Sequence, residues 1–404
     1  MSKRANGEGS YNFDAANNRW LFRLTINGKK FNKAGRKGES KKDFKKRISE
    51  FIEEKTKEAF CENEKLTLGE WIVRWLDAEK STIKIRTYDY YRKFCKNYIQ
   101  PKLGNMLLQD LTPVVLQEFF NTMKNENGVN NKPLAPATIN GIRRTIKRIL
   151  KVACDNGLIN DNPAAKTKPI RQKEKEILTL SVEQLQKLLS IASSQDYIYV
   201  NTRQSWTEDP GMKYLRICTY YLLIVAIVTG MRQGELFGLE WQDIDFKNKF
   251  IYVRHNLQYS SEGLVFDSPK TKQSKRILKI DDKTIEKLKE WQCYQLNFAK
   301  KYSTSFKNKN DLLFTNSFGK PMSASNFRRT YWRKLMLACE FDENITFHSL
   351  RHSYATNLLA AGVDIRTVSQ RLGHASLSTT MIYVNLLPEW QETAVEKFAA
   401  LKIF

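Results

Sequence analysis

The feature that most constrains this chain is the stretch over residues 346–386, which contains three of its four histidines. It reads T-F-H-S-L-R-H-S-Y-A-T, then R-L-G-H, then T-T-M-I-Y-V. Arg351 follows His348 by three residues, so the two side chains lie on one side of any helix that they share. Gly373 is typical of a helix end, and the helix predicted after it carries Tyr383. The stretch therefore predicts successive helices that carry imidazole, guanidinium and phenol groups.

Imidazole, guanidinium and phenol groups gathered in this way suit an attack on a phosphodiester. The N–H donors neutralise the phosphate and the phenol is the nucleophile. A lone histidine or tyrosine is more often structural than catalytic, and His-x-x-Arg by itself is a weak indication. The complete set of histidines, arginine and tyrosine is a far more specific indication of this chemistry.

Three sequence blocks resemble the tyrosine recombinase (lambda-integrase) family, whose mechanism is similar to that of type IB topoisomerases. They are H-S-L-R-H, then L-G-H with a tyrosine nine residues later, and upstream T-G-M-R-Q-G-E-L. Asn385 departs from the pattern, because many relatives have a non-catalytic histidine there. The resemblance implies six catalytic residues, in the family's order: Arg232, Lys272, His348, Arg351, His374 and Tyr383.

Arg232 follows an apolar segment, residues 214–228, that predicts a buried helix. Its guanidinium would therefore emerge from a rigid base. Glu235, one helical turn on, is expected to orient Arg232 rather than act on the substrate.

The family keeps a lysine in a hairpin, which here falls in P-K-T-K-Q-S-K-R, between strands predicted at residues 264–268 and 276–280. Alignment to K-x-S-x-R carries the role to Lys272. Lys270 is the alternative, because it lies two residues away on the same strand face.

The resemblance implies that Tyr383 attacks a DNA phosphate, giving a 3′-phosphotyrosyl linkage and a free 5′-hydroxyl. The two arginines and His374 hold the non-bridging oxygens. His348 is the candidate base for the phenol proton, and Lys272 is the candidate acid for the leaving oxygen. Neither a metal nor ATP is needed, and the sequence has no Walker loop and no Cys/His metal cluster, so we expect no cofactor.

The net charge of +24 over 404 residues implies a polyanionic partner, and double-stranded DNA is the leading candidate. The six cysteines are scattered and make no C-x-x-C, which favours free thiols in a reducing cytosol. The start, M-S-K-R-A-N-G, lacks the apolar core of a signal peptide. The most apolar run, residues 217–228, is too short to span a bilayer. We therefore expect a cytoplasmic protein that does not enter the membrane.

A chain of this length predicts two or three domains. We predict a multidomain, mainly α fold with small β-sheets. Its parts are an arm-type DNA-binding domain of three strands plus a helix (1–62), a helical core-site DNA-binding domain (63–165), a linker (166–176), and a mixed α+β catalytic domain with a C-terminal tail helix (177–404).

Residues 19–26 alternate between two strand faces, one with Trp20, Phe22, Leu24 and Ile26 and the other with Arg19, Leu21, Arg23 and Thr25. Asn27-Gly28 is a strong hairpin signal. Residues 9–13 and 29–33 supply the neighbouring strands, and Ser40-x-x-Asp43 opens a helix that covers the apolar face. The segment resembles the arm-binding domain of conjugative-transposon and phage integrases. The alternative is a solvated basic face with no partner. The residues predicted to bind DNA from the polar face are Arg19, Arg23 and Lys29.

Four helices are predicted between residues 67 and 155, the second of them ending before Pro101. They resemble the family's core-binding domain. The fourth helix, from about residue 137 to 155, has an apolar face and a basic face with no acidic residue. A solvated face would usually include glutamates, so this face predicts a grip on the phosphate backbone. Its residues are Arg143, Arg144, Lys147, Arg148 and Lys151.

About 21 residues follow Tyr383, and an apolar stripe predicts a short tail helix. In the family such a tail docks on a neighbouring protomer of a homotetramer. The alternative is a helix folded back on its own domain. The resemblance also implies two partners, an excisionase and a DNA-bending host protein.

The sequence thus predicts an integrase of a phage or conjugative element that inserts and excises it by site-specific recombination. A chromosome or plasmid resolvase, or an invertase, is the alternative within the family. A second class is a non-catalytic architectural DNA-binding protein, which would be expected to lose part of the six-residue set. A metal-dependent nuclease would need clustered carboxylates near these motifs.

Overall fold

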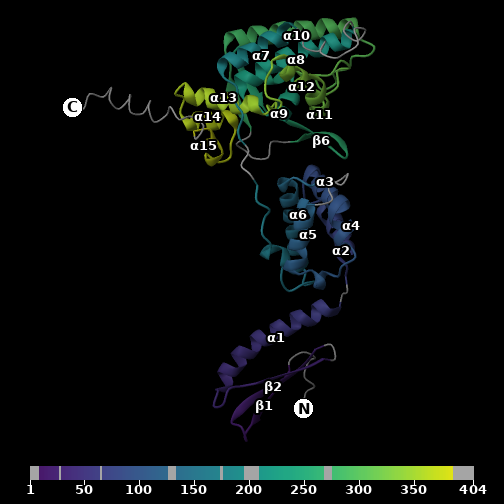
Figure 1. The fold of residues 1–404 in the computed structure, drawn as a ribbon, viewed down its shortest axis with the longest axis vertical. Helices are drawn as coiled ribbons and strands as arrows, with labels where there is room; N and C mark the ends of the chain where they lie inside the picture. Colours follow the sequence, from purple (N-terminus) through teal and green to yellow (C-terminus); the bar gives the residue numbers. More distant parts are fainter. Residues whose placement is uncertain are drawn as a thin grey trace, which may run out of the picture. The chain divides into compact units, whose positions relative to one another are not determined.

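The computed structural model describes residues 9–26, 29–63, 66–125, 133–172, 176–194, 209–267 and 275–384 (Figure 1). The chain divides into two units, residues 1–174 and 175–404. Each unit is described by itself.

The first unit begins with an antiparallel sheet in the order β1-β2-β3, followed by a helix. Asp43 N–H donates to Ser40 Oγ at 3.2 Å, which confirms the predicted helix start. Phe22 and Leu24 of the sheet are buried against Phe44 and Ile48 of the helix, so the predicted sheet-plus-helix arrangement is correct. The elements are β1 (Ser10–Asp14), β2 (Arg19–Ile26), β3 (Lys29–Ala34) and α1 (Lys41–Asn63).

A helical domain follows in the same unit, and its core is built from apolar faces that the sequence predicts. Thr67 and Glu70 form a capping box at its first helix. Trp71 Nε1 donates to the carbonyl of Ile149 at 3.1 Å and so joins the first helix of the domain to its longest helix, residues 136–155. The helices are α2 (Leu68–Glu79), α3 (Ile85–Phe94), η1 (Cys95–Ile99), α4 (Gln100–Leu103), η2 (Leu108–Asp110), α5 (Pro113–Asn125), α6 (Pro136–Asp155) and η3 (Pro163–Lys166).

The second helix does not end before Pro101, as the sequence predicted, but continues to Leu103. A π-helical turn, η1, precedes the proline, and in it Gln100 N–H donates to the carbonyl of Cys95. Such a wide turn departs from the regular α-helical hydrogen-bond ladder. Because the ladder is already interrupted there, the proline ring and its missing N–H are tolerated.

The second unit contains α7 to α15 and two small antiparallel sheets, in the orders β4-β5-β8 and β6-β7. Its helices are α7 (Val182–Ser194), α8 (Pro210–Thr229), α9 (Gln233–Phe237), η6 (Trp241–Asp243), α10 (Asp282–Lys301), α11 (Ala324–Phe327), η8 (Arg328–Trp332), α12 (Arg333–Ala338), α13 (Ser349–Ala360), α14 (Ile365–Leu372) and α15 (Ser378–Val384). Its strands are β4 (Ile244–Asp245), β5 (Phe250–Val253), β6 (Asn256–Ser260), β7 (Gly263–Asp267) and β8 (Arg276–Lys279).

Helix α8 is the centre of this unit. It is the one helix among the described residues that is long and apolar enough to cross a membrane. However, Tyr214, Cys218 and Leu222 are fully buried in the hydrophobic core with Trp291 of α10. The predicted buried helix is therefore confirmed, although it is longer than the apolar run alone indicated.

The strands differ from the prediction in one respect. The sequence placed residues 264–268 and 276–280 in one hairpin, but β7 pairs with β6 and β8 pairs with β5. The sequence analysis missed β6, although its sequence N-L-Q-Y-S alternates between polar and apolar side chains over five residues. The two predicted strands thus belong to different sheets. Between α7 and α8, residues 195–208 lie outside the described part.

Candidate active site

The predicted site forms where α13, α14 and α15 pack against one another (Figure 1). His348 precedes the first residue of α13, and Tyr383 lies in α15. Gly373 ends α14 with a φ of 68°, a left-handed conformation that favours glycine. This turn directs the chain from α14 into the segment that carries His374.

The C-terminal end of α14 holds three arginines. Helix ends leave carbonyl groups without partners in the helix and carry partial negative charge. The carbonyl oxygens of residues 371, 372 and 373 accept hydrogen bonds, in that order, from Arg276 Nε at 2.7 Å, Arg351 Nη2 at 2.7 Å and Arg232 Nη2 at 3.3 Å. One helix end therefore fixes three guanidinium groups contributed by β8, α13 and the start of α9.

Arg351 is almost completely buried, with 2% of its surface exposed. Its Nη1 donates to the carbonyl of Gly230 at 2.9 Å, at the end of α8. Burial, together with the charge of Arg232, lowers the pKa of Arg351 to about 9. That value is above neutral pH, so the guanidinium remains charged.

Glu235 is the carboxylate of this cluster. It accepts hydrogen bonds from Arg232 Nη1 at 2.8 Å and from Arg276 Nη2 at 2.8 Å, which confirms the expected contact with Arg232. Burial alone raises its pKa, but the hydrogen bonds and charges of Arg276 and Arg232 outweigh that effect and lower the pKa to about 2. Three guanidinium groups and one carboxylate leave two positive charges, which suits a bound phosphate.

His374 and Tyr383 lie beside these arginines. Their rings stack with centroids 6.4 Å apart and planes 14° apart. His374 Nδ1 lies 2.8 Å from Thr380 Oγ1, which fixes the orientation of the imidazole. Burial and the charge of Arg351 lower the pKa of His374 to about 4, so the ring is neutral at pH 7.

Tyr383 is 2% exposed, and its Oη lies 2.9 Å from Nδ1 of His352. Burial raises the pKa of the phenol, while Arg351 and Arg232 act in the opposite direction. The sequence nominated His348 as the partner of this phenol. The imidazole that contacts it is instead that of His352. The His348 ring lies 4.6 Å from the His352 ring, centroid to centroid.

The sequence of the chain matches the pattern of a known protein family. The sequence pattern of the phage integrase family matches residues 179–389, just over half of the chain. The chain belongs to this family of tyrosine recombinases. It is therefore a site-specific DNA recombinase of the integrase type, an enzyme that cuts and rejoins DNA. The pattern of the phage integrase N-terminal SAM-like domain matches residues 67–124.

Two relatives resemble nearly the whole recombinase. A tyrosine recombinase XerC-like protein of Caldanaerobacter subterraneus subsp. tengcongensis is 28% identical over 382 residues, 89% of each chain. The integrase of Staphylococcus phage L54a is 25% identical over 370 residues, 88% of this chain and 99% of its own.

Solved structures share the fold. The Tn1549 transposon integrase, in complex with a circular intermediate DNA, superposes with a TM-score of 0.61 at 20% identity, over 79% of this chain and 94% of its own. A lambda integrase dimer bound to a core site gives 0.53 at 22% identity, over 78% and 97%.

The structure of the recombinase thus brings together five of the six predicted site residues. Lys272 and its alternative, Lys270, lie outside the described residues. So do the predicted tail helix and Asn385. Two residues of the cluster had no assigned role from sequence. Arg276 was read only as part of K-x-S-x-R, and His352 only as a third histidine in its stretch, because neither spacing nor residue type reveals which carbonyl or hydroxyl a side chain meets.

Two of the five basic residues predicted to bind DNA from α6 make internal contacts. Arg143 donates through Nε and Nη2 to the hydroxyl and carbonyl oxygens of Thr167, at 2.9 and 2.6 Å. Arg148 pairs with Glu79 at 3.1 Å. The pattern showed a basic face but not these partners, which come from distant parts of the chain. The three exposed members without such a contact described here are Arg144, Lys147 and Lys151.

The basic face of the N-terminal sheet follows the predicted alternation. Arg19 Nε lies 3.5 Å from Asp14 Oδ2, and Arg23 Nε donates to Asn32 Oδ1 at 3.2 Å. Lys29 begins β3, and its side chain is outside the described part.

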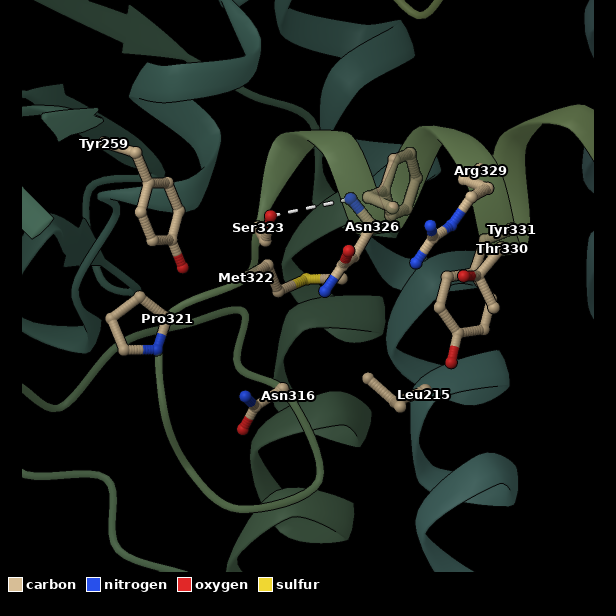
Figure 2. Close-up of a pocket in the computed structure, with 11 residues that line it drawn as sticks. Leu215, Tyr259, Asn316, Pro321, Met322, Ser323, Asn326, Arg329, Thr330 and Tyr331 are labelled. Carbon is tan, nitrogen blue, oxygen red and sulfur yellow. Dashed lines mark hydrogen bonds between the residues drawn. The ribbon is translucent and has the colours of Figure 1, made fainter. Parts of the chain in front are cut away.

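Two hollows lie among the described residues of the catalytic unit. One, of about 420 Å³, is lined by Arg276, Gly373 and His374 of the cluster together with Lys275 and Arg366. The other, of about 300 Å³, shares no residue with the cluster. Figure 2 shows that its labelled walls carry a single charged group, Arg329. The first hollow is therefore the one with the donors that a phosphodiester needs.

Proposed function

We propose that this recombinase integrates and excises a mobile DNA element, and that Tyr383 forms a 3′-phosphotyrosyl intermediate with each cut strand. The observation that carries the proposal is the guanidinium cluster at the end of α14, which lies beside the buried phenol. In water-excluded surroundings, such fixed donors stabilise the charge that develops on a phosphate under attack.

Each side chain has a role in this scheme. Arg232 and Arg351 hold the non-bridging oxygens, and His374 supplies a further donor. Lys272 gives a proton to the leaving 5′ oxygen. The hollow beside His374 admits the DNA backbone, because Lys275 and Arg366 on its walls add positive charge. Removal of one such donor is expected to raise the barrier by roughly 3–4 kcal/mol.

The reaction takes place in the cytoplasm of the host cell, on attachment sites held by a homotetramer. The integrase of Staphylococcus phage L54a and the ICEBs1 integrase of Bacillus subtilis, both relatives of this chain, support the mobile-element role. An excisionase and a DNA-bending host protein act with the enzyme. The XerC-like relative favours a second candidate, a chromosome or plasmid resolvase. An assay with two sites on one plasmid separates the two, since a resolvase acts on identical sites and an integrase on unlike ones.

The deciding experiment uses a nicked duplex that carries the element's own end sequence, incubated with protein in EDTA. The nick releases the 5′ fragment and traps the covalent product. We expect an SDS-resistant adduct that disappears in Tyr383→Phe and persists in Tyr259→Phe. Tyr259 is the better control, because it is 51% exposed, whereas the Tyr354 hydroxyl accepts a hydrogen bond from Arg371. Tight binding without an adduct would support an architectural protein instead.

A further inference from the structure

Tyr383 and His352 form a hydrogen-bonded pair inside the site. The Oη–Nδ1 distance is 2.9 Å, and the ring centroids are 5.5 Å apart. His352 projects from α13 one turn after His348, and α15 packs against that helix. The reacting atom of the nucleophile is therefore already in contact with a nitrogen that can accept a proton.

The direction of the hydrogen bond follows from the acidity of the two groups. Burial and the neighbouring Arg351 lower the pKa of His352 below 6.5, so the imidazole is neutral at pH 7. The charged and titratable groups around it are His348 and Arg351 on its own helix and Tyr383 on α15. A neutral imidazole is a stronger base than a phenol, so the hydroxyl donates and Nδ1 accepts.

We propose that His352 is the base that removes the phenolic proton of Tyr383 as it attacks DNA, the role for which the sequence nominated His348. The inference rests on the proposed function. In the step, a bond forms between Oη and phosphorus, and the bond from phosphorus to the 5′ oxygen breaks. The electron pair leaves with that oxygen, which takes a proton from Lys272. The phenolic proton moves to Nδ1 of His352, and it returns when the 5′-hydroxyl of a partner strand reverses the step.

His348 remains in the site with a different task. Its imidazole meets the His352 ring edge to face, with centroids 4.6 Å apart and planes at 86°, whereas the hydrogen bond to the phenol is made by His352. Burial and the neighbouring His352 lower the pKa of His348, and Arg351 and Arg232, which hold the phosphate in the proposed scheme, lower it further. His348 is therefore placed to donate to DNA rather than to take the proton of the nucleophile.

His352→Asn is the informative variant. Its Oδ1 takes the place of Nδ1 and still accepts a hydrogen bond from Tyr383, but an amide cannot take up a proton. His255→Asn is the matched control, since His255 is the one histidine outside the cluster and packs on Phe266 of β7. For both proteins we would measure the single-turnover rate of adduct formation on the nicked duplex between pH 6 and 9.5, with DNA affinity measured separately.

We expect His352→Asn to slow adduct formation roughly 10²- to 10⁴-fold with unchanged affinity. Its rate should then rise with pH, because hydroxide must now remove the proton. Replacing the bridging 5′ oxygen by sulfur should not restore the rate, because a thiolate leaving group removes the need for an acid and not for a base. A wild-type rate and pH profile in His352→Asn, or rescue by sulfur, would overturn the proposal.

Two further results distinguish a failure of the His352 proposal from a failure of the proposed function. If wild-type protein forms no adduct, or Tyr383→Phe still forms one, the proposed function itself fails. If His352→Asn unfolds, His352→Ala with added imidazole replaces it. Recovery of the rate, dependent on the concentration of neutral imidazole, supports the proton-accepting role, and no recovery in folded His352→Ala contradicts it.

Discussion

Arg276 grips the carboxylate of Glu235 with both ends of its guanidinium, Nη2 to Oε2 at 2.8 Å and Nη1 to Oε1 at 3.1 Å. Both side chains are buried, at 6% and 3% exposure. Because Glu235 also bonds Arg232, and Arg276 also bonds the end of α14, this pair joins β8, α9 and α14. A residue outside the predicted six therefore sets the position of one that is inside.

Replacing Arg276 by lysine tests that role. Lysine keeps the charge but lacks the planar fork, so Glu235 loses one partner and the carbonyl of residue 371 loses another. We expect a loss of about 1–3 kcal/mol in the free energy of unfolding and an adduct rate at least tenfold lower, with DNA affinity little changed. Arg92→Lys is the control, because its pair with Asp89 is exposed and is worth about 0–1 kcal/mol. Equal effects of the two variants on stability and adduct rate would show that Arg276 does not set the position of the site residues.

The low pKa of Glu235 predicts a dependence of stability on pH. Its pKa is about 2 in the folded protein, against an ordinary 4.5. The contribution is therefore fully present above about pH 4.5 and is lost as the pH falls toward 2, because the unfolded carboxyl takes its proton first. The difference corresponds to about 3 kcal/mol, at roughly 1.4 kcal/mol per pKa unit.

Urea unfolding of wild type and Glu235→Gln at several pH values measures this contribution. The variant should be the less stable at pH 7, and the gap should narrow below pH 4.5. Glu343→Gln, at an exposed position, should follow wild type throughout. A gap that stays constant down to pH 3 would mean that the carboxylate is not held in its charged form by the two arginines.

Gly230 joins α8 to the segment that carries Arg232, and its φ is 61°. A Cβ there would lie 2.4 Å from the ring of Tyr354, so Gly230→Ala adds a clash to the left-handed strain of roughly 1–2 kcal/mol. Gly263→Ala is the control, since its φ is also positive but nothing lies near its Cβ. We expect Gly230→Ala to destabilise the catalytic unit more, in thermal unfolding, and also to slow cleavage, because the Gly230 carbonyl holds Arg351.

The sequence was sufficient to predict whatever depends on local pattern. The alternation in residues 19–26, the capping boxes and the buried α8 all follow from periodicity and helix-cap chemistry. The cluster of five site residues followed from the family resemblance. What could not be predicted was pairing over long separations: which strand β8 joins, which hydroxyl His352 meets, and which carboxylate Arg148 meets. Those contacts depend on packing between elements, which leaves no signal in the spacing of either partner.

Helix α6 offers a direct comparison between basic residues that look alike in sequence. The guanidinium of Arg143 bonds Thr167, whereas Arg144, its neighbour, is exposed. Arg144→Ala should weaken DNA binding uniformly across sequences and reduce the slope of log affinity against log salt concentration by about one, with stability within about 0.5 kcal/mol of wild type.

Arg143→Ala should instead lower the stability of the helical domain by about 1–3 kcal/mol, because it leaves the oxygens of Thr167 without these donors. Salt titrations of DNA binding, paired with urea unfolding of both variants, check the division. If Arg143→Ala lowered the salt slope and left stability intact, the basic face would act as the sequence pattern alone predicted.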